Sequence, residues 1–155
     1  MNELTKQEKT TDLMTKSDYT FLLKKIEENA KKIEIVEKKA SKHGKQLREI
    51  EEEYPLLPPE ADDLAKAVQR KGVEVMGGKK SNAYANTDLR RKVYRDIYTE
   101  IKRNFGLIDE RGRQKSYKKL KRRNLKGAMM IVDEYILPIS LENEVDEEND
   151  LGDVT

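Results

Sequence analysis

The sequence has no cysteine and only one histidine, His43. Without cysteine it can form neither a disulfide framework nor a catalytic thiolate. A metal site needs several convergent ligands, which one histidine does not supply. The longest apolar runs cover only a few residues, so we expect no signal peptide and no membrane-spanning helix. These absences favour a soluble, intracellular protein without a cofactor or a metal centre.

Hydrophobic residues are also scarce. They make up 35% of the 155 residues, whereas charged residues make up 40%. A single compact core of this length usually carries a larger apolar fraction. We therefore expect a small globular unit, a long charged helix and some disorder.

The charge is distributed unevenly along the chain. The net charge is −1 over residues 1–60, +10 over residues 61–140 and −7 over residues 141–155. A basic middle segment followed by an acidic tail suggests an anionic partner for the middle segment.

The stretch from 87 to 107 is the strongest helix prediction. Thr87 or Asp88 can cap its start, and Gly106 can end it in a left-handed conformation. Apolar side chains recur at spacings of three and four and define one face: Val93, Tyr94, Ile97, Tyr98, Ile101 and Phe105. The other faces are cationic and carry Arg90, Arg91, Lys92, Arg95, Lys102 and Arg103.

Residues 18–54 show a heptad pattern, with steps of three and four from Tyr19 to Tyr54. This pattern favours a coiled-coil oligomerisation helix; the alternative is a single amphipathic helix folded against the domain. His43 falls on the seam, where we expect a packed or partly exposed imidazole and not a metal ligand. The predicted oligomer interface consists of Leu22, Ile26, Ile33, Val36, Leu47 and Ile50.

The rest of the chain completes an all-α prediction. Residues 1–17 are expected to be a flexible N-terminus, residues 55–60 a proline-rich linker and residues 139–155 an acidic disordered tail. Between them, residues 61–138 are predicted to form a basic three-helix domain, with helices over 61–76, 87–107 and 116–138. Its predicted core consists of Leu64, Val68, Val93, Ile97, Ile101, Phe105, Leu125, Met129 and Val132.

A glycine pair precedes two lysines at Gly77–Lys80. Such a cluster can suggest a phosphate-binding loop, but the Walker spacing and its preceding strand are missing. We interpret the glycines as a helix stop and residues 79–86 as a loop.

Three motifs make residues 64–137 similar to the phage ORF-six-C domain. The first is Leu64 and Val68, followed by Gly77-Gly78 and Tyr84. The second is Ile97–Leu107, which resembles the family's IYxDLKRxFGV helix. The third is similar to SYxxIPRxxFxxAL and consists of Ser116, Tyr117, Leu120, Arg122, Leu125 and Ala128.

The resemblance implies a phage-encoded regulatory protein that contacts nucleic acid, without implying catalysis. The domain commonly follows a KilA-N, BRO-N or Rha-type domain in antirepressor-like proteins; here a heptad helix precedes it. Lys121 stands where the family usually has proline. The implied location is the cytoplasm of an infected bacterial host.

Two functions remain open, and neither is enzymatic, because no acid–base pair or metal cluster can be assembled from these residues. The first is an oligomer that binds duplex DNA through a basic helical surface. The alternative is an adaptor or antirepressor that binds a host or phage repressor or replication protein through the coiled coil or the helical domain. The predicted DNA contacts are Arg90, Arg91, Arg95, Lys102, Arg103, Lys118, Lys119, Arg122 and Arg123.

Overall fold

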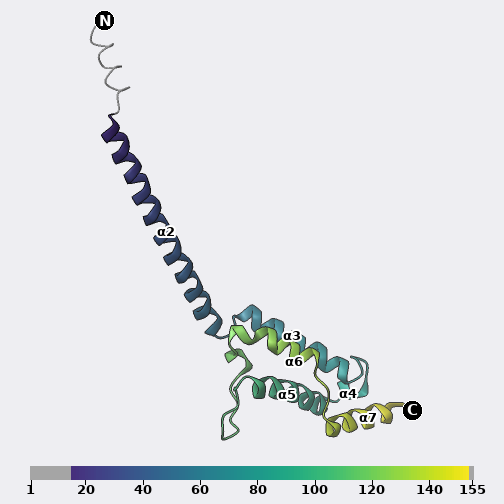
Figure 1. Ribbon diagram of the computed structural model, residues 1–155. Coiled ribbons are helices and arrows are strands. Elements are labelled where there is room, and N and C mark those ends of the chain that lie inside the picture. Colours follow the sequence, from purple (N-terminus) through teal and green to yellow (C-terminus); the bar gives the residue numbers. More distant parts are fainter. Residues whose placement is uncertain (1–14, 154–155) are drawn as a thin grey trace. The chain divides into compact units, whose positions relative to one another are not determined.

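The computed structural model describes residues 15–153 (Figure 1). These residues are mostly helical and include no strand, which confirms the all-α prediction. Backbone pairing outside the helices includes two isolated bridges, Pro55 with Lys121 and Ile108 with Gln114. The chain divides into the units Met1–Glu49 and Ile50–Thr155. This division precedes the predicted linker at 55–60.

The first unit holds most of α2, the helix Lys16–Glu53. The hydroxyl of Thr15 donates to Asp18 Oδ2 over 2.7 Å, and Asp18 N–H donates back to that hydroxyl over 3.2 Å. No residue of α2 is buried, and its seam residues Ile26 and Ile33 are 62% and 58% exposed. The coiled coil therefore stays a prediction that needs a second copy of the helix. Most of the flexible segment predicted over 1–17 lies outside the described residues.

The second unit begins with a correction to the proline-rich linker. Pro58 and Pro59 open α3, which spans Pro58–Val75. Proline suits the first helical positions, because its missing N–H has no partner there and its φ is already helical. Leu64 and Val68 are fully buried on α3, as predicted. Gly77 and Gly78 then take positive φ angles of 96° and 103°, in agreement with a helix stop.

The loop predicted over 79–86 contains a short helix, α4, at Asn82–Ala85, because the hydroxyl of Ser81 accepts from Tyr84 N–H and caps it. The central helix, α5, follows at Thr87–Asn104. Its cap is Asn86 and not Thr87 or Asp88: the Asn86 side chain accepts from two first-turn N–H groups over 3.1 Å. Gly106 ends the helix region with φ of 68°, as expected.

The predicted helix over 116–138 is wrong in its first half. Two single 3-10 turns, η1 (Tyr117–Lys119) and η2 (Arg122–Asn124), flank extended backbone at Leu120 and Lys121. Leu120 is 1% exposed, and its carbonyl accepts from Leu56 N–H over 2.9 Å. The backbone pairing between Leu56 and Leu120 therefore overrides the helix propensity of this segment. Lys121 takes a φ of −70°, which is the backbone that a proline would impose.

Helix α6 covers only Leu125–Asp133. Its Val132 is buried together with five other predicted core residues: Leu64, Val68, Val93, Ile97 and Ile101. The remaining three predicted core residues, Phe105, Leu125 and Met129, pack against the core but are only half-buried. Buried residues outside the prediction include Met76, Leu120, Tyr135 and Val145.

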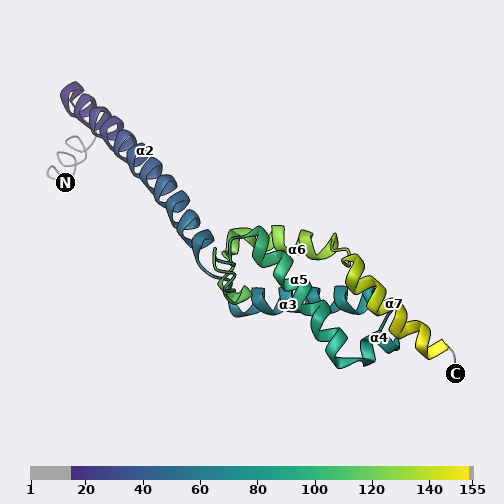
Figure 2. The same ribbon diagram turned by 90° about the horizontal axis from the view of Figure 1, so that it is seen from below.

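The predicted disordered tail is instead helix α7, Ile139–Asp153, which contacts α4 and α5 (Figure 2). Val145 is 3% exposed, so the acidic helix buries an apolar residue. The Asn149 amide accepts from Ala83 N–H over 2.9 Å and donates to Met76 O over 3.1 Å. These contacts supply the packing that acidic composition alone does not predict. The second unit therefore contains α4 and α7 in addition to α3, α5 and α6, and the three-helix description is incomplete.

Candidate nucleic-acid interface

One side of α5 carries cations with few partners. Arg91, Arg95 and Lys102 are spaced by four and seven residues, which places them on one side of a helix. Within residues 15–153, the carboxylate nearest to Arg91 is that of Asp88, at the long distance of 4.0 Å. Lys102 Nζ donates to the neutral amide oxygen of Gln114 over 3.2 Å. We call Arg91, Arg95 and Lys102 the basic row.

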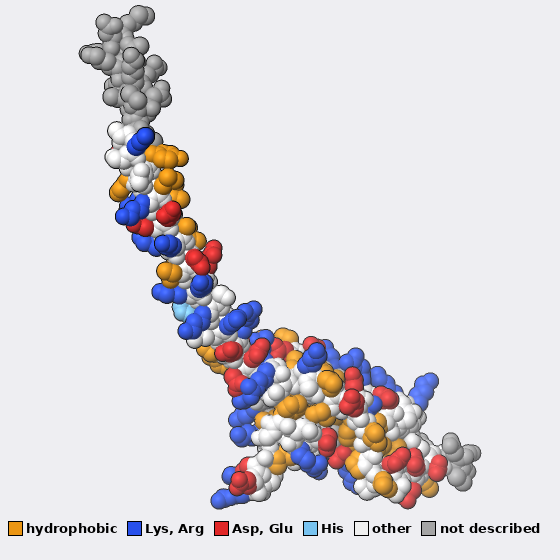
Figure 3. Space-filling model, viewed as in Figure 1, with side chains coloured by type: hydrophobic (Ala, Val, Ile, Leu, Met, Phe, Trp, Pro, Cys, Tyr) orange, Lys and Arg blue, Asp and Glu red, His pale blue; other side chains and the backbone are white. Residues whose placement is uncertain are grey.

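The flank of α5 that carries Lys92, Asp96 and Arg103 is neutralised by ion pairs and hydrogen bonds, between the basic row and the buried apolar stripe. Lys92 Nζ lies 2.7 Å from Glu144 Oε2 of α7, and Arg103 pairs with Glu100 over 3.2 Å. Asp96 accepts a 2.5 Å hydrogen bond from the Tyr135 hydroxyl. Burial is the main cause that raises the pKa of Tyr135, and the hydrogen bond to this carboxylate is the second cause. Figure 3 shows acidic side chains gathered over the part of the second unit that holds α7. Helix α5 therefore carries weakly partnered cations on one side and paired cations on another.

The turn η1 lies beside α5 through an aromatic contact. The rings of Tyr98 and Tyr117 stack with 4.8 Å between centroids and 29° between planes. Burial is the main cause that raises the pKa of Tyr98 to about 12, and the neighbouring Tyr117 is the second cause. The hydroxyl of Ser116 accepts from Lys118 N–H over 3.3 Å and shapes the turn. Lys118 and Lys119 are exposed next to this contact.

The predicted contacts Arg122 and Arg123 are engaged within the chain. Arg122 Nε donates to Glu60 Oε1 over 2.9 Å, between half-buried side chains. Arg123 pairs with Glu53, which also accepts a 2.5 Å hydrogen bond from Lys121. That hydrogen bond, followed by the charges of Arg123 and Lys121, lowers the pKa of Glu53. Both arginines thus hold the 53–60 segment against the η1–η2 segment.

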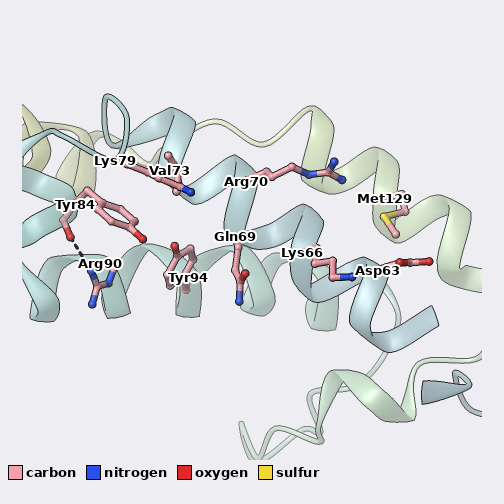
Figure 4. Close-up of a pocket in the computed structure, with 10 residues that line it drawn as sticks. All are labelled: Asp63, Lys66, Gln69, Arg70, Val73, Lys79, Tyr84, Arg90, Tyr94 and Met129. Carbon is pink, nitrogen blue, oxygen red and sulfur yellow. Dashed lines mark hydrogen bonds between the residues drawn. The ribbon is translucent and has the colours of Figure 1, made fainter. Parts of the chain in front are cut away.

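A groove with a volume of about 830 Å³ is lined mainly by residues of α3 and α5. We call it the α3–α5 groove. Figure 4 shows its lining, which includes four cations and one carboxylate. The lining residues are Asp63, Lys66, Gln69, Arg70, Val73, Lys79, Tyr84, Arg90, Tyr94 and Met129.

Arg90 belongs to this groove and not to the basic row. Its Nη1 donates to Tyr84 O over 3.1 Å, and its guanidinium carbon lies 4.9 Å from the centroid of the Tyr84 ring. Arg90 therefore positions the Tyr84 side chain. Its guanidinium is also one of the cations that line the groove.

The structure brings some predicted contacts together and separates others. The η1 turn contacts α5 at Tyr98, which lies between Arg95 and Lys102 of the basic row. Arg103 is instead paired with Glu100, and Arg90 lines the groove. The prediction missed three groove cations, Lys66, Arg70 and Lys79. The spacing of 66, 70 and 73, which places these residues on one face of α3, was the signal that would have found two of them.

Residues 15–153 contain no group of three or more histidine, cysteine or acidic side chains arranged to hold a metal ion. Among the same residues, no helix has the length and apolar content needed to cross a bilayer.

A family model for the ORF6C (ORF-six-C) domain matches residues 25–145, which is most of the chain. The protein belongs to the ORF6C domain family. The match extends beyond the resemblance at 64–137 and includes most of α2 and the start of α7. ORF6C is a phage-associated domain family. No curated protein and no solved structure matches the chain.

Proposed function

We propose that this ORF6C protein is a non-enzymatic, antirepressor-like phage regulator that binds duplex DNA through the basic row and the η1 lysines. The two-sided charge of α5 carries this proposal. Among the described residues, the row cations have no carboxylate partner closer than the 4.0 Å approach of Asp88 to Arg91, whereas Lys92 and Arg103 are paired within 3.2 Å.

The chemistry of the row suits phosphate. Lysine and arginine neutralise backbone phosphates and release condensed counterions, and contacts of this kind position a protein without reading the bases. The basic row contributes three such cations, and the exposed Lys118 and Lys119 add two. The expected binding is therefore weak in sequence preference and strongly dependent on salt.

The exposed seam of α2 supports self-association. Its apolar side chains are unburied within one chain, with Ile26 at 62% and Val36 at 63% exposure. A second copy of the helix can cover them in a coiled coil, with Lys32 pairing across the seam with Glu37 of the other copy. An oligomer would present the basic row more than once, so avidity would raise a weak single-unit affinity.

A salt titration tests the proposal. The anisotropy of a labelled mixed-sequence duplex is measured with the wild-type chain from about 50 to 200 mM salt. The logarithm of the association constant should fall linearly with the logarithm of salt concentration, by roughly 0.9 per phosphate neutralised. Absence of any salt-dependent binding with several unrelated duplexes would reject DNA binding. The adaptor that binds a repressor or replication protein would then be the better account.

A further inference from the structure

The α3–α5 groove combines two features that contacts to a duplex backbone do not need: a concave volume and two tyrosines in its lining. Its volume of about 830 Å³ lies in the range of small-ligand sites. A duplex presents a phosphate backbone and bases whose faces are already stacked on one another, so those faces are not available to the tyrosine rings. The groove therefore fits a smaller ligand, or a nucleic acid whose bases are unpaired.

The cations of the groove lack partners of opposite charge. Lys66, Arg70 and Lys79 make no side-chain hydrogen bond or ion pair with any described residue. Only Asp63 provides a carboxylate in the lining. A concave surface lined mainly by one sign of charge concentrates the potential, so this groove attracts an anion.

The aromatic residues are fixed by close packing. A Cβ at Gly72 would lie 2.3 Å from Tyr94 Cε1, so glycine at this position lets the Tyr94 ring lie against α3. Arg90 holds Tyr84 from the other side. In Figure 4 the Tyr84 ring points from α4 toward Tyr94. The half-buried Val73 and Met129 add apolar surface to the lining.

We propose that the α3–α5 groove binds an unpaired nucleotide, with its base against Tyr94 and the apolar lining and its phosphate attracted by the groove cations Lys66, Arg70 and Lys79. Aromatic side chains bind bases of any sequence by stacking, and a cationic groove follows the backbone of a single strand. A single-stranded DNA segment and a free nucleotide share this chemistry. The site is separate from the basic row on α5.

The test uses the full chain and a labelled twelve-residue oligothymidylate. Arg70→Gln and Lys79→Gln are combined in one variant, and Lys31→Gln with Lys45→Gln on α2 is the control with the same charge change. The groove variant should bind the single strand about tenfold more weakly, and its salt slope should be shallower by about 1.4, because a single strand gives roughly −0.7 per phosphate. The control variant should stay within about twofold of wild type.

A second variant, Tyr94→Leu, separates stacking from charge. It should weaken binding of the single strand without changing the salt slope, with helicity and the thermal melt checked by circular dichroism. Competition with thymidine monophosphate distinguishes the two sources: displacement shows that the free nucleotide is sufficient, and its absence assigns the ligand to a strand.

Duplex binding distinguishes this inference from the proposed function. The groove variant should keep its duplex affinity within about twofold. Single-strand binding equal in the groove and control variants would overturn the inference, and so would parallel losses on single strand and duplex. Groove-dependent binding of the single strand without any duplex binding would reject the proposed function and leave the groove site intact.

Discussion

Tyr98 of α5 and Tyr117 of η1 stack at a centroid distance of 4.8 Å, and this contact fixes the η1 lysines beside the basic row. It also predicts a pH dependence. Burial, followed by Tyr117, raises the pKa of Tyr98 to about 12, above the value of about 10 for an unfolded tyrosine. The folded state therefore holds this proton more tightly.

The free energy of unfolding should fall as pH rises from about 10 to about 12, because the stabilising proton is retained only in the folded state. Below pH of about 10 this contribution is fully present. Urea denaturation followed by circular dichroism at several alkaline pH values measures the effect. Tyr98→Phe should reduce the steepness of the fall, while lysine titration affects both proteins equally. Equal steepness in the two proteins would contradict the burial of the Tyr98 hydroxyl.

The hydrogen bonds of Asn149 should stabilise the packing of α7. Asn149→Ala leaves Ala83 N–H and Met76 O without their partner, which should lower the free energy of unfolding by about 1–3 kcal/mol. Asn143→Ala on the same helix is the control. Its side chain is exposed, so the change should stay within about 0.5 kcal/mol. Equal stability of the two variants, measured by urea denaturation, would contradict the claim that the Asn149 hydrogen bonds stabilise the packing of α7.

Self-association should depend on the seam of α2. Ile26→Asp with Ile33→Asp should give monomers at micromolar concentration, because an unpaired charge at a buried interface is costly. Ile35→Asp is the control, since Ile35 is 54% exposed but lies off the heptad seam. Static light scattering of the wild type and both variants is the measurement. A monomeric wild type, or an Ile35→Asp variant that dissociates as fully as the seam variant, would reject the coiled coil.

Periodicity predicted the parts of the fold that obey local rules. The stripe of α5 and the burial of Leu64, Val68 and Val132 follow from helical spacing. Leu120 does not follow, because its burial depends on a backbone hydrogen bond with Leu56, which is distant in sequence. Similarly, α7 depends on the contacts of Asn149, a single polar residue in an acidic segment.

The site was predicted less completely, because ion pairing is a tertiary property. The sequence marks Arg91 and Arg122 equally as cations, yet Arg122 pairs with the half-buried Glu60 and Arg91 stays 72% exposed. The groove combines α3, α4, α5 and α6, and no single stretch of sequence contains its charge. Only the packing of these helices separates cations that stabilise the fold from those that can meet a ligand.

The most direct test of the account reverses the basic row. Arg91→Glu, Arg95→Glu and Lys102→Glu are combined and compared with Lys24→Glu, Lys31→Glu and Lys45→Glu, three exposed α2 cations without ion pairs among the described residues. Both variants change the net charge equally. Duplex affinity is measured as a function of salt, with helicity and oligomeric state checked in parallel. The row variant should lose binding, or retain a salt slope shallower by about 2.7, while the α2 variant stays close to wild type. Equal affinity of the row variant and the wild type would contradict DNA binding by this side of α5.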